Sequence, residues 1–270
     1  MFYSSRSLLA GCAIAAAFVA SSAQAAAPNG FAGTFSADYA NTDYSGGGGN
    51  ADTWGLNGAG AFDLGMNDLG GEINGSYHRV SVDSFDANIW NIGGSVFWAP
   101  GYGRFGPTIS YTTVNFNDIS GVDAHATTYG LFGEFFVNDM FTIGVKGGGT
   151  DGKWNISGFG SGSETGGYVG GELTGYAMPN LAIKGNVEYV EVGGVHVTNY
   201  GLNAEYLVSE ETPISVFGGY TRTDLSNGAG HGDTWMVGLK FYVGPGNLVT
   251  RHRTGTLGSL GTVSGLNFAF

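Results

Sequence analysis

Cysteine is nearly absent from the sequence, because Cys12 is the only one among 270 residues. It lies in an N-terminal segment that carries Arg6, an apolar stretch from Leu8 to Ala20 and a small-residue cleavage site at Ala23-Gln24-Ala25. This order of features is typical of a secretion signal. The segment Leu9-Ala10-Gly11-Cys12 also matches a lipoprotein signal, but the apolar stretch continues well past the cysteine, so we expect residues 1–25 to be removed. The mature chain then has no cysteine, which excludes disulfides, thiolate chemistry and cysteine-ligated metals.

Charge and long apolar runs are also scarce. Only 12% of the residues are charged, against about 25% in ordinary soluble domains. The balance is 22 Asp and Glu against 10 Lys and Arg, which argues against a nucleic-acid partner. No apolar run after Ala20 approaches the about 20 residues of a membrane helix. The sequence is instead 14% aromatic and holds 51 glycines, so it has too many aromatic residues for a disordered chain.

Between Phe31 and Val243, segments of about ten residues alternate apolar and polar positions, as expected of membrane strands. Twelve such segments are separated by turns and polar loops. The short turns fall at 65–68, 99–104, 138–139, 178–180 and 209–213, and the loops at 41–51, 83–86, 117–123, 151–164, 193–194 and 224–232. Strict alternation of turns and loops predicts an all-β fold, a transmembrane antiparallel up-and-down β-barrel over residues 26–243. The turns then face the periplasm, and 151–164 is the longest outer loop.

Aromatic residues recur at two heights along these strands. The belt on the loop side comprises Trp54, Trp90, Tyr129, Tyr200 and Trp235, and the belt on the turn side comprises Phe62, Trp98, Phe135, Tyr206 and Phe241. The similar strand starts on the loop side indicate a repeated hairpin unit. Belts about eight residues apart span about 21 Å on tilted strands, close to the lipid-facing band of known barrels. The alternative is a soluble barrel or sandwich with these aromatics in its core.

With the aromatic residues facing outward, a charged set falls on the inner face. The predicted pore-lining residues are Asp38, Asp63, Glu72, Glu134, Glu172, Glu188 and Glu205, with Lys146, Lys184 and Lys240. Glu172 lies on a strand that alternates poorly, because it shares its parity with Tyr168 and Tyr176. An excess of carboxylates in a lumen favours cations. The alternative is that the same side chains pair into a polar plug, as in small barrels with filled interiors.

The C-terminus carries Gly265-Leu-Asn-Phe268-Ala-Phe270, and a similar pattern occurs in Gly238-Leu-Lys-Phe241-Tyr-Val243. In these motifs and in the strand pattern of residues 30–243, the sequence resembles bacterial outer-membrane porin-like β-barrels. The resemblance implies export to the outer membrane, contact with its lipid, and passive transport of small solutes. It further implies that Gly265, Phe268 and Phe270 form a signal for the barrel assembly machinery.

The two copies of this motif leave two strand counts open. If the first copy closes the barrel, the count is twelve and residues 244–270 form a tail; if the second copy does, it is fourteen and a strand covers 248–256. Twelve is favoured, because the extra strand would place Arg251 and Arg253 or His252 toward lipid, and a lipid-facing Arg costs about 2–4 kcal/mol near the midplane. The basic residues of the tail predict that it docks at the acidic periplasmic mouth.

Catalytic and metal-binding patterns are weak. His78 and Ser76 share the inner face of one strand, and His125, His196 and His231 lie near loops, without a surrounding motif of nucleophilic catalysis or of metal binding. The glycine clusters lack the Lys-Ser/Thr of a phosphate loop and are expected to serve close packing. We therefore predict no enzyme, no cofactor and no metal. The leading prediction is a channel for passive diffusion of small neutral or cationic solutes; the alternative is a closed structural or surface-interaction barrel without transport. The sequence indicates no oligomeric state.

Overall fold

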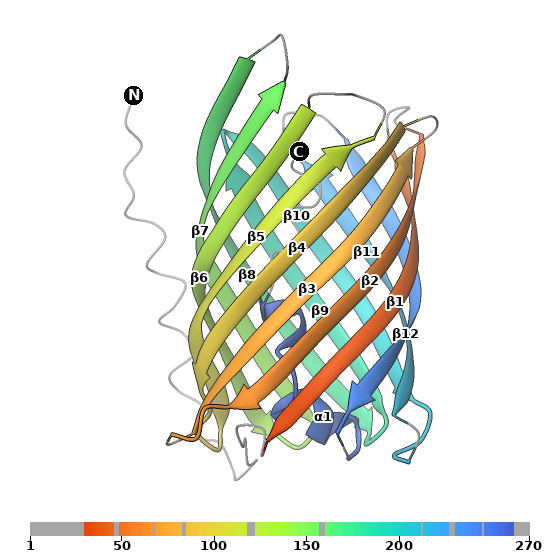
Figure 1. The fold of residues 1–270 in the computed structure, drawn as a ribbon. Coiled ribbons are helices and arrows are strands. Elements are labelled where there is room, and N and C mark those ends of the chain that lie inside the picture. Colours follow the sequence, from red (N-terminus) through yellow and green to blue (C-terminus); the bar gives the residue numbers. More distant parts are fainter. Residues whose placement is uncertain are drawn as a thin grey trace.

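A computed structural model describes residues 30–45, 49–66, 68–82, 85–117, 122–156, 160–211, 213–226, 230–244 and 246–261. These residues form a closed barrel of antiparallel strands in sequential order, followed by a short helix (Figure 1). The strands are β1 (Phe31–Tyr44), β2 (Asn50–Asp63), β3 (Leu69–Val82), β4 (Phe85–Trp98), β5 (Gly103–Phe116), β6 (Val122–Asn138), β7 (Phe141–Ile156), β8 (Gly160–Met178), β9 (Leu181–Val192), β10 (Val195–Leu207), β11 (Ile214–Leu225) and β12 (His231–Val243). The prediction of a twelve-strand barrel is confirmed.

The barrel closes between its first and last strands. β1 pairs with β12 from Gly33 opposite Val243 to Tyr44 opposite Gly232. The fourteen-strand alternative is wrong, because the residues expected to form the next strand are the helix α1 (Leu248–Thr254), followed by a single 3-10 turn at Gly258–Gly261. Neither helical segment of the described chain is long and apolar enough to cross a membrane.

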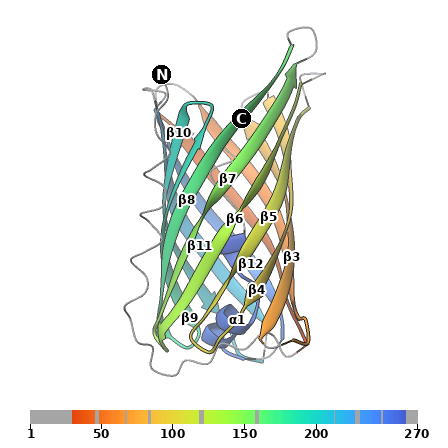
Figure 2. The same cartoon turned by 90° about the vertical axis from the view of Figure 1, so that its left-hand side faces the viewer.

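Two rims bound the barrel, and the short connections lie on one of them. The turn rim holds the connections at 64–68, 99–102, 139–140, 179–180 and 208–213, as well as the start of β1 and the end of β12. The loop rim holds the other connections. The predicted long loop at 151–164 is wrong: β7 and β8 stay paired up to Ile156 opposite Gly160, and they extend beyond their neighbours at the loop rim (Figure 2). Backbone hydrogen bonds hold the two strands together there whatever side chains they carry, so the polar sequence did not reveal how far the strands extend.

The strands alternate between an apolar outer face and a polar inner face. On β10, Tyr200, Leu202 and Tyr206 are exposed outside, whereas Asn199 is buried inside. The irregular strand β8 follows the same rule once its tyrosines are placed inside. Its exposed residues include Val169 and Leu173, whereas Tyr168 and Tyr176 are buried in the lumen beside Glu172.

Candidate functional site

The outer surface carries the ten aromatic residues predicted to form the belts. On the loop side, Trp54, Trp90, Tyr129, Tyr200 and Trp235 are all exposed. On the turn side, Trp98, Tyr206 and Phe241 are exposed, and Phe62 and Phe135 are half-buried against aromatic or glycine neighbours. Three hairpins repeat one loop-side unit, in which a Tyr ring lies beside the Trp of the next strand and its hydroxyl donates to the residue two positions before that Trp. The units are Tyr39 with Trp54 and Asp52, Tyr77 with Trp90 and Asn88, and Tyr220 with Trp235 and Asp233.

The lumen divides into two halves that differ in their chemistry. We call the part nearer the turn rim the turn half and the part nearer the loop rim the loop half. Eight of the ten predicted pore-lining residues lie in or next to the turn half: Glu72, Glu134, Lys146, Glu172, Lys184, Glu188, Glu205 and Lys240. Glu134 pairs with Arg104, and the other seven contact the chain that follows β12 or one another. Asp38 lies apart from them in the loop half. Asp63 is exposed at the end of β2, where its carboxylate accepts a hydrogen bond from the Gly65 amide (2.7 Å) and so holds a turn instead of facing the lumen.

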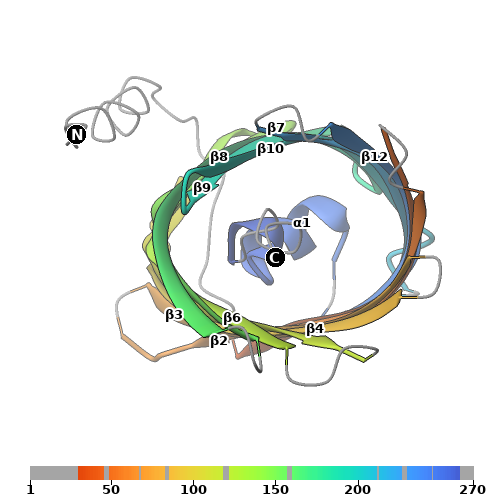
Figure 3. The same ribbon diagram turned by 90° about the horizontal axis from the view of Figure 1, so that it is seen from above.

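Residues 246–261, which we call the tail segment, turn back from β12 into the barrel (Figure 3). The backbone turns at Gly244 and Gly246, whose φ angles of 121° and 108° favour glycine. Helix α1 then begins with Asn247 as its N-cap, because the Asn247 side chain accepts a hydrogen bond from the Thr250 amide (3.0 Å). The prediction that the basic tail docks at the mouth on the turn side agrees with this placement.

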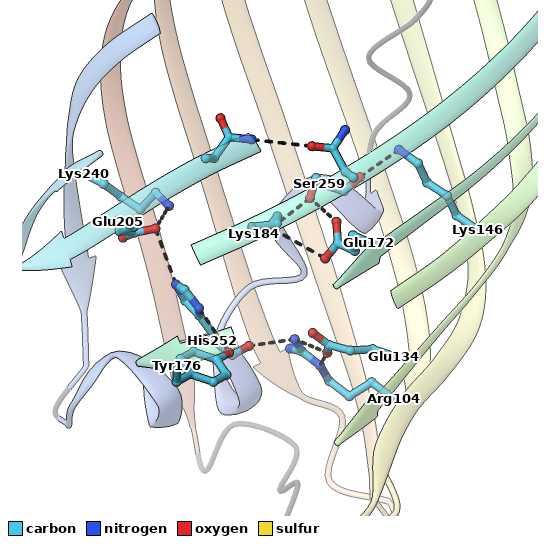
Figure 4. Close-up of polar contacts among 12 residues, drawn as sticks. Arg104, Glu134, Lys146, Glu172, Tyr176, Lys184, Glu205, Lys240, His252 and Ser259 are labelled. Carbon is cyan, nitrogen blue, oxygen red and sulfur yellow. Dashed lines mark hydrogen bonds and ion pairs between the residues drawn. The ribbon is translucent and has the colours of Figure 1, made fainter. Parts of the chain in front are cut away.

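Arg104 is the most deeply buried contact between the wall and the tail segment. It pairs with Glu134 of β6 at 2.6 Å, and their side chains are 1% and 8% exposed. Its remaining N–H groups donate to the backbone carbonyls of Gly255 (2.6 Å) and His252 (2.8 Å). One guanidinium thus joins β5, β6 and the tail segment (Figure 4). The sequence prediction missed Arg104 because it assigned this residue to the turn at 99–104; a lone Arg at the start of a strand gave no further signal.

A second set of contacts surrounds Ser259. Its hydroxyl donates to Glu172 (2.5 Å) and accepts from Lys184 (3.0 Å), and Lys184 lies 3.5 Å from the Glu172 carboxylate. Lys146 donates to the Ser259 carbonyl (3.0 Å) and pairs with Glu188 at 2.5 Å. Charges of β7, β8 and β9 are therefore satisfied by one another and by this part of the tail segment.

Across the lumen, Glu72 of β3 accepts a hydrogen bond from the Leu257 amide at 2.5 Å. Leu257 and Leu260 pack with Phe97 and Phe132 in a small apolar cluster. Leu248 packs against Tyr176, Ala182, Leu207 and Tyr242 in another. The tail segment is thus held by apolar contacts as well as by charges.

His252 of α1 lies between two tyrosines of the wall. Its Nδ1 is 3.3 Å from the Tyr176 hydroxyl, and its Nε2 is 3.1 Å from the Tyr242 hydroxyl and 3.5 Å from Glu205. Glu205 also pairs with Lys240 at 2.7 Å. Burial lowers the pKa of His252 below its usual 6.5, and the Glu205 carboxylate opposes this shift only in part.

The neighbouring arginines of α1 bind the turn rim. Arg251 donates to the carbonyls of Gly246 (2.6 Å) and Glu210 (3.3 Å). Arg253 donates to the carbonyls of Asn138 and Phe141 and lies over the ring of Phe136. All three consecutive basic residues thus contact the wall.

The loop half of the lumen carries amides and hydroxyls together with buried apolar side chains such as Ile89, Val114 and Ala124. Hydrogen bonds there join Ser110 to Thr128, Asn91 to Thr112, Asn199 to Thr223 and Thr42 to Thr234. Asp38 accepts from Asn57 (2.8 Å), whose own carbonyl is 3.2 Å from His78. Among the described residues, no Lys or Arg forms an ion pair with Asp38.

Several polar side chains of the lumen wall, at mid-barrel and on the turn side, lie flat on glycines of the next strand. A Cβ added to the glycine would come within 3.0 Å of the oxygen above it in four pairs: Asp38 over Gly55, Asn74 over Gly93, Asn186 over Gly201 and Asn203 over Gly219. Each glycine is on the inner face, so a side chain that would otherwise project inward lies along the wall. The high glycine content therefore thins the lining of the lumen, in addition to allowing close packing.

Comparison with known proteins identifies the fold. No protein-family model matches the chain, and no curated protein matches it in sequence. The translocator domain of the autotransporter NalP from Neisseria meningitidis is similar in structure, with a TM-score of 0.51 and 16% identity over 78% of this chain and 88% of that one. An outer-membrane channel from Pseudomonas putida F1 has a TM-score of 0.54 and 13% identity over 83% of this chain and 100% of that one. The chain has the fold of a bacterial outer-membrane β-barrel of the channel or porin-like kind.

The proposed assembly signal Gly265, Phe268 and Phe270 lies outside the described residues. The similar motif that ends at Val243 is part of β12, the strand that closes the barrel. The predicted signal peptide likewise lies outside the described residues and stays a prediction.

Proposed function

We propose that this protein is a non-enzymatic outer-membrane channel for passive diffusion of small neutral or cationic solutes. The observation that carries the proposal is the lumen wall between the two rims, where polar side chains lie flat on inward-facing glycines. A barrel whose interior serves only to be filled gains stability from large side chains that project inward. Here the polar side chains lie along the wall instead of projecting into the lumen, which supports a route for solutes.

The chemistry of this lining supports the proposed class of solute. Neutral amides and hydroxyls of the loop half, such as those of Asn91 and Thr112, suit small polar solutes, which form hydrogen bonds without a charged partner. The carboxylate of Asp38 adds negative charge to the loop half and favours cations over anions. The glutamates of the turn half contribute less, because they are compensated by nearby cations.

Planar-bilayer recording of the purified chain tests the proposal. We expect discrete openings, with a reversal potential in a salt gradient that indicates a mild preference for cations. Asp38→Asn is expected to reduce this preference, whereas Asp63→Asn, at the turn rim, serves as the matched control and leaves it unchanged. Anion preference in the unaltered chain would refute the charge argument.

The tail segment favours the second candidate, a closed barrel with a structural or surface-interaction role. It contacts the wall on many sides and satisfies most of the predicted pore-lining charges. A chain that shifts its gel mobility on boiling, as a folded barrel does, but gives no openings in bilayers under any condition would establish this alternative.

A further inference from the structure

The tail segment binds strands around the barrel and not only one side of it. Its partners include Thr34 of β1, Glu72 of β3, Phe97 of β4, Arg104 of β5, Phe132 of β6, Lys146 of β7, Tyr176 of β8, Lys184 of β9, Glu205 of β10 and Tyr242 of β12. In the view along the barrel axis, α1 and the chain that follows it occupy the centre of the ring (Figure 3). The segment therefore obstructs the turn half.

The attachment of this segment differs from that of a strand. Within the described residues, a single backbone-to-backbone hydrogen bond joins it to the wall, from the Leu248 amide to the Pro179 carbonyl (2.9 Å). The ladder between β1 and β12 closes the barrel without it. The segment can thus leave the wall without breaking any strand pairing, and the glycines at 244 and 246 lie where it would swing.

Water can replace most of the contacts that hold the segment. Wall groups bind its backbone at Gly255, Leu257 and Ser259 through side-chain hydrogen bonds, and ion pairs within the wall such as Lys146 with Glu188 persist without it. Apolar contacts are limited to small clusters around Leu248, Leu257 and Leu260. This chemistry resembles that of a reversible interface more than that of a strand in a sheet.

We propose that the tail segment is a gate: its seated position closes the channel on the turn side, and solutes pass when it leaves its seat. The proposal rests on the proposed channel function and adds its regulation. It predicts that the same chain is silent when the segment is fixed and conducts when the segment is free.

A reversible disulfide tests this in the full-length protein, because the mature chain is predicted to have no cysteine. The hydroxyls of Thr34 and Thr256 are 3.3 Å apart, so Thr34→Cys with Thr256→Cys places two thiols close enough to bridge β1 and the tail segment. The matched control is Thr42→Cys with Thr234→Cys, whose hydroxyls are 2.8 Å apart and whose bridge joins β1 to β12 without the tail segment. Maleimide labelling verifies that each bridge forms and is reduced.

We expect oxidation of the first pair to abolish openings in planar bilayers and a reductant to restore them. Oxidation of the control pair is expected to leave openings unchanged. Equal conductance of the first pair before and after reduction would overturn the gate and leave the channel function standing. Silence of every chain, including an Arg104→Ala variant that loosens the tail segment, would overturn the channel function and the gate together.

Discussion

The two halves of the lumen are built by the same twelve strands but differ in the charge and the contacts of their side chains. In the turn half, charged side chains are buried and each meets a counterion or the backbone of the tail segment, as Arg104 does with Glu134 and Gly255. In the loop half, neutral side chains line the wall, as Ser110 and Thr128 do with their hydrogen-bonded hydroxyls. The difference teaches that the wall places most of its charge where protein groups compensate it, and keeps groups of low desolvation cost in the half where we propose that solutes pass.

The largest expected effect on the turn half is that of Arg104→Ala. It leaves Glu134 buried without its cation, and removing one member of a buried pair costs about 3–5 kcal/mol. Because Arg104 also binds two carbonyls of the tail segment, much of this loss falls on docking. We expect trypsin to cleave after Arg251 and Arg253 much faster in the variant, as measured by mass spectrometry of the digested, folded barrel.

Arg222→Ala is the matched control, since Arg222 forms an exposed, solvent-screened pair with Asp224 that contributes little to stability. It is expected to leave the cleavage rate unchanged. The double variant Arg104→Ala with Glu134→Gln should recover part of the barrel's stability, because no uncompensated charge remains. Equal tail protection in Arg104→Ala and in the unaltered chain would show that this residue does not hold the segment.

Docking of the tail segment is expected to depend on pH through His252, because burial lowers the pKa of this residue when the segment is docked. The free segment then takes up a proton first as the pH falls below about 6.5. The equilibrium constant for docking of the tail segment is therefore largest above this pH. It falls by up to about tenfold for each pH unit below it, until the lowered pKa of His252 is reached. Trypsin cleavage of the tail between pH 7.5 and 5.5 measures the effect.

Charged and titratable groups from several elements face this histidine: Glu205 of β10, Lys240 and Tyr242 of β12, Tyr176 of β8 and Lys184 of β9. His252→Gln keeps a donor and an acceptor for the tyrosines but cannot titrate in this range. We expect its tail cleavage, corrected for the protease's own pH profile, to be flat between pH 7.5 and 5.5. A pH dependence equal to that of the unaltered chain would assign the effect to another group.

The smallest expected effect is that of Gly201→Ala at mid-barrel. The added Cβ meets the Asn186 amide, which is the end of a flexible side chain, so the barrel loses only about 1 kcal/mol or less. Asn186 must turn away from the wall, and we expect a partial fall in single-channel conductance. Gly185→Ala on the neighbouring strand, where a Cβ meets nothing within 4 Å, should leave conductance unchanged. Equal conductance of both variants would remove the support for a thinned wall.

The barrel itself was predictable because one face of each strand meets lipid. Alternation of apolar and polar residues then repeats over twelve segments and indicates which residues face inward, although the two closing motifs left twelve and fourteen strands open. Glu172 lies inside although two tyrosines share its face. The lumen of this barrel buries aromatic rings beside tail residues, so an aromatic residue is not a reliable marker of the outside.

The arrangement of the site was less predictable, because it depends on contacts between distant segments. Asp63 has the parity of a lumen residue, but its position at a strand end decided its role in the turn. Arg104 looked like part of a turn, and its partners Glu134 and Gly255 lie 30 and 151 positions away in the sequence. The basic run at Arg251 predicted docking, but local propensity did not show that Leu248–Thr254 form a helix rather than another strand.

The tail segment also determines the order in which the molecule can be completed. Its contacts join residues as far apart as Thr34 and Thr256, 222 positions along the chain, whereas eleven of the twelve strand pairs of the barrel are hairpins of neighbours in sequence and only the seam between β1 and β12 is distant. Contacts across such distances form late, because a long loop must close before they stabilise anything. Closure of the seam and docking of the tail segment are therefore both expected to follow the pairing of neighbouring strands, so the chain is a curved sheet of hairpins before it is a filled barrel.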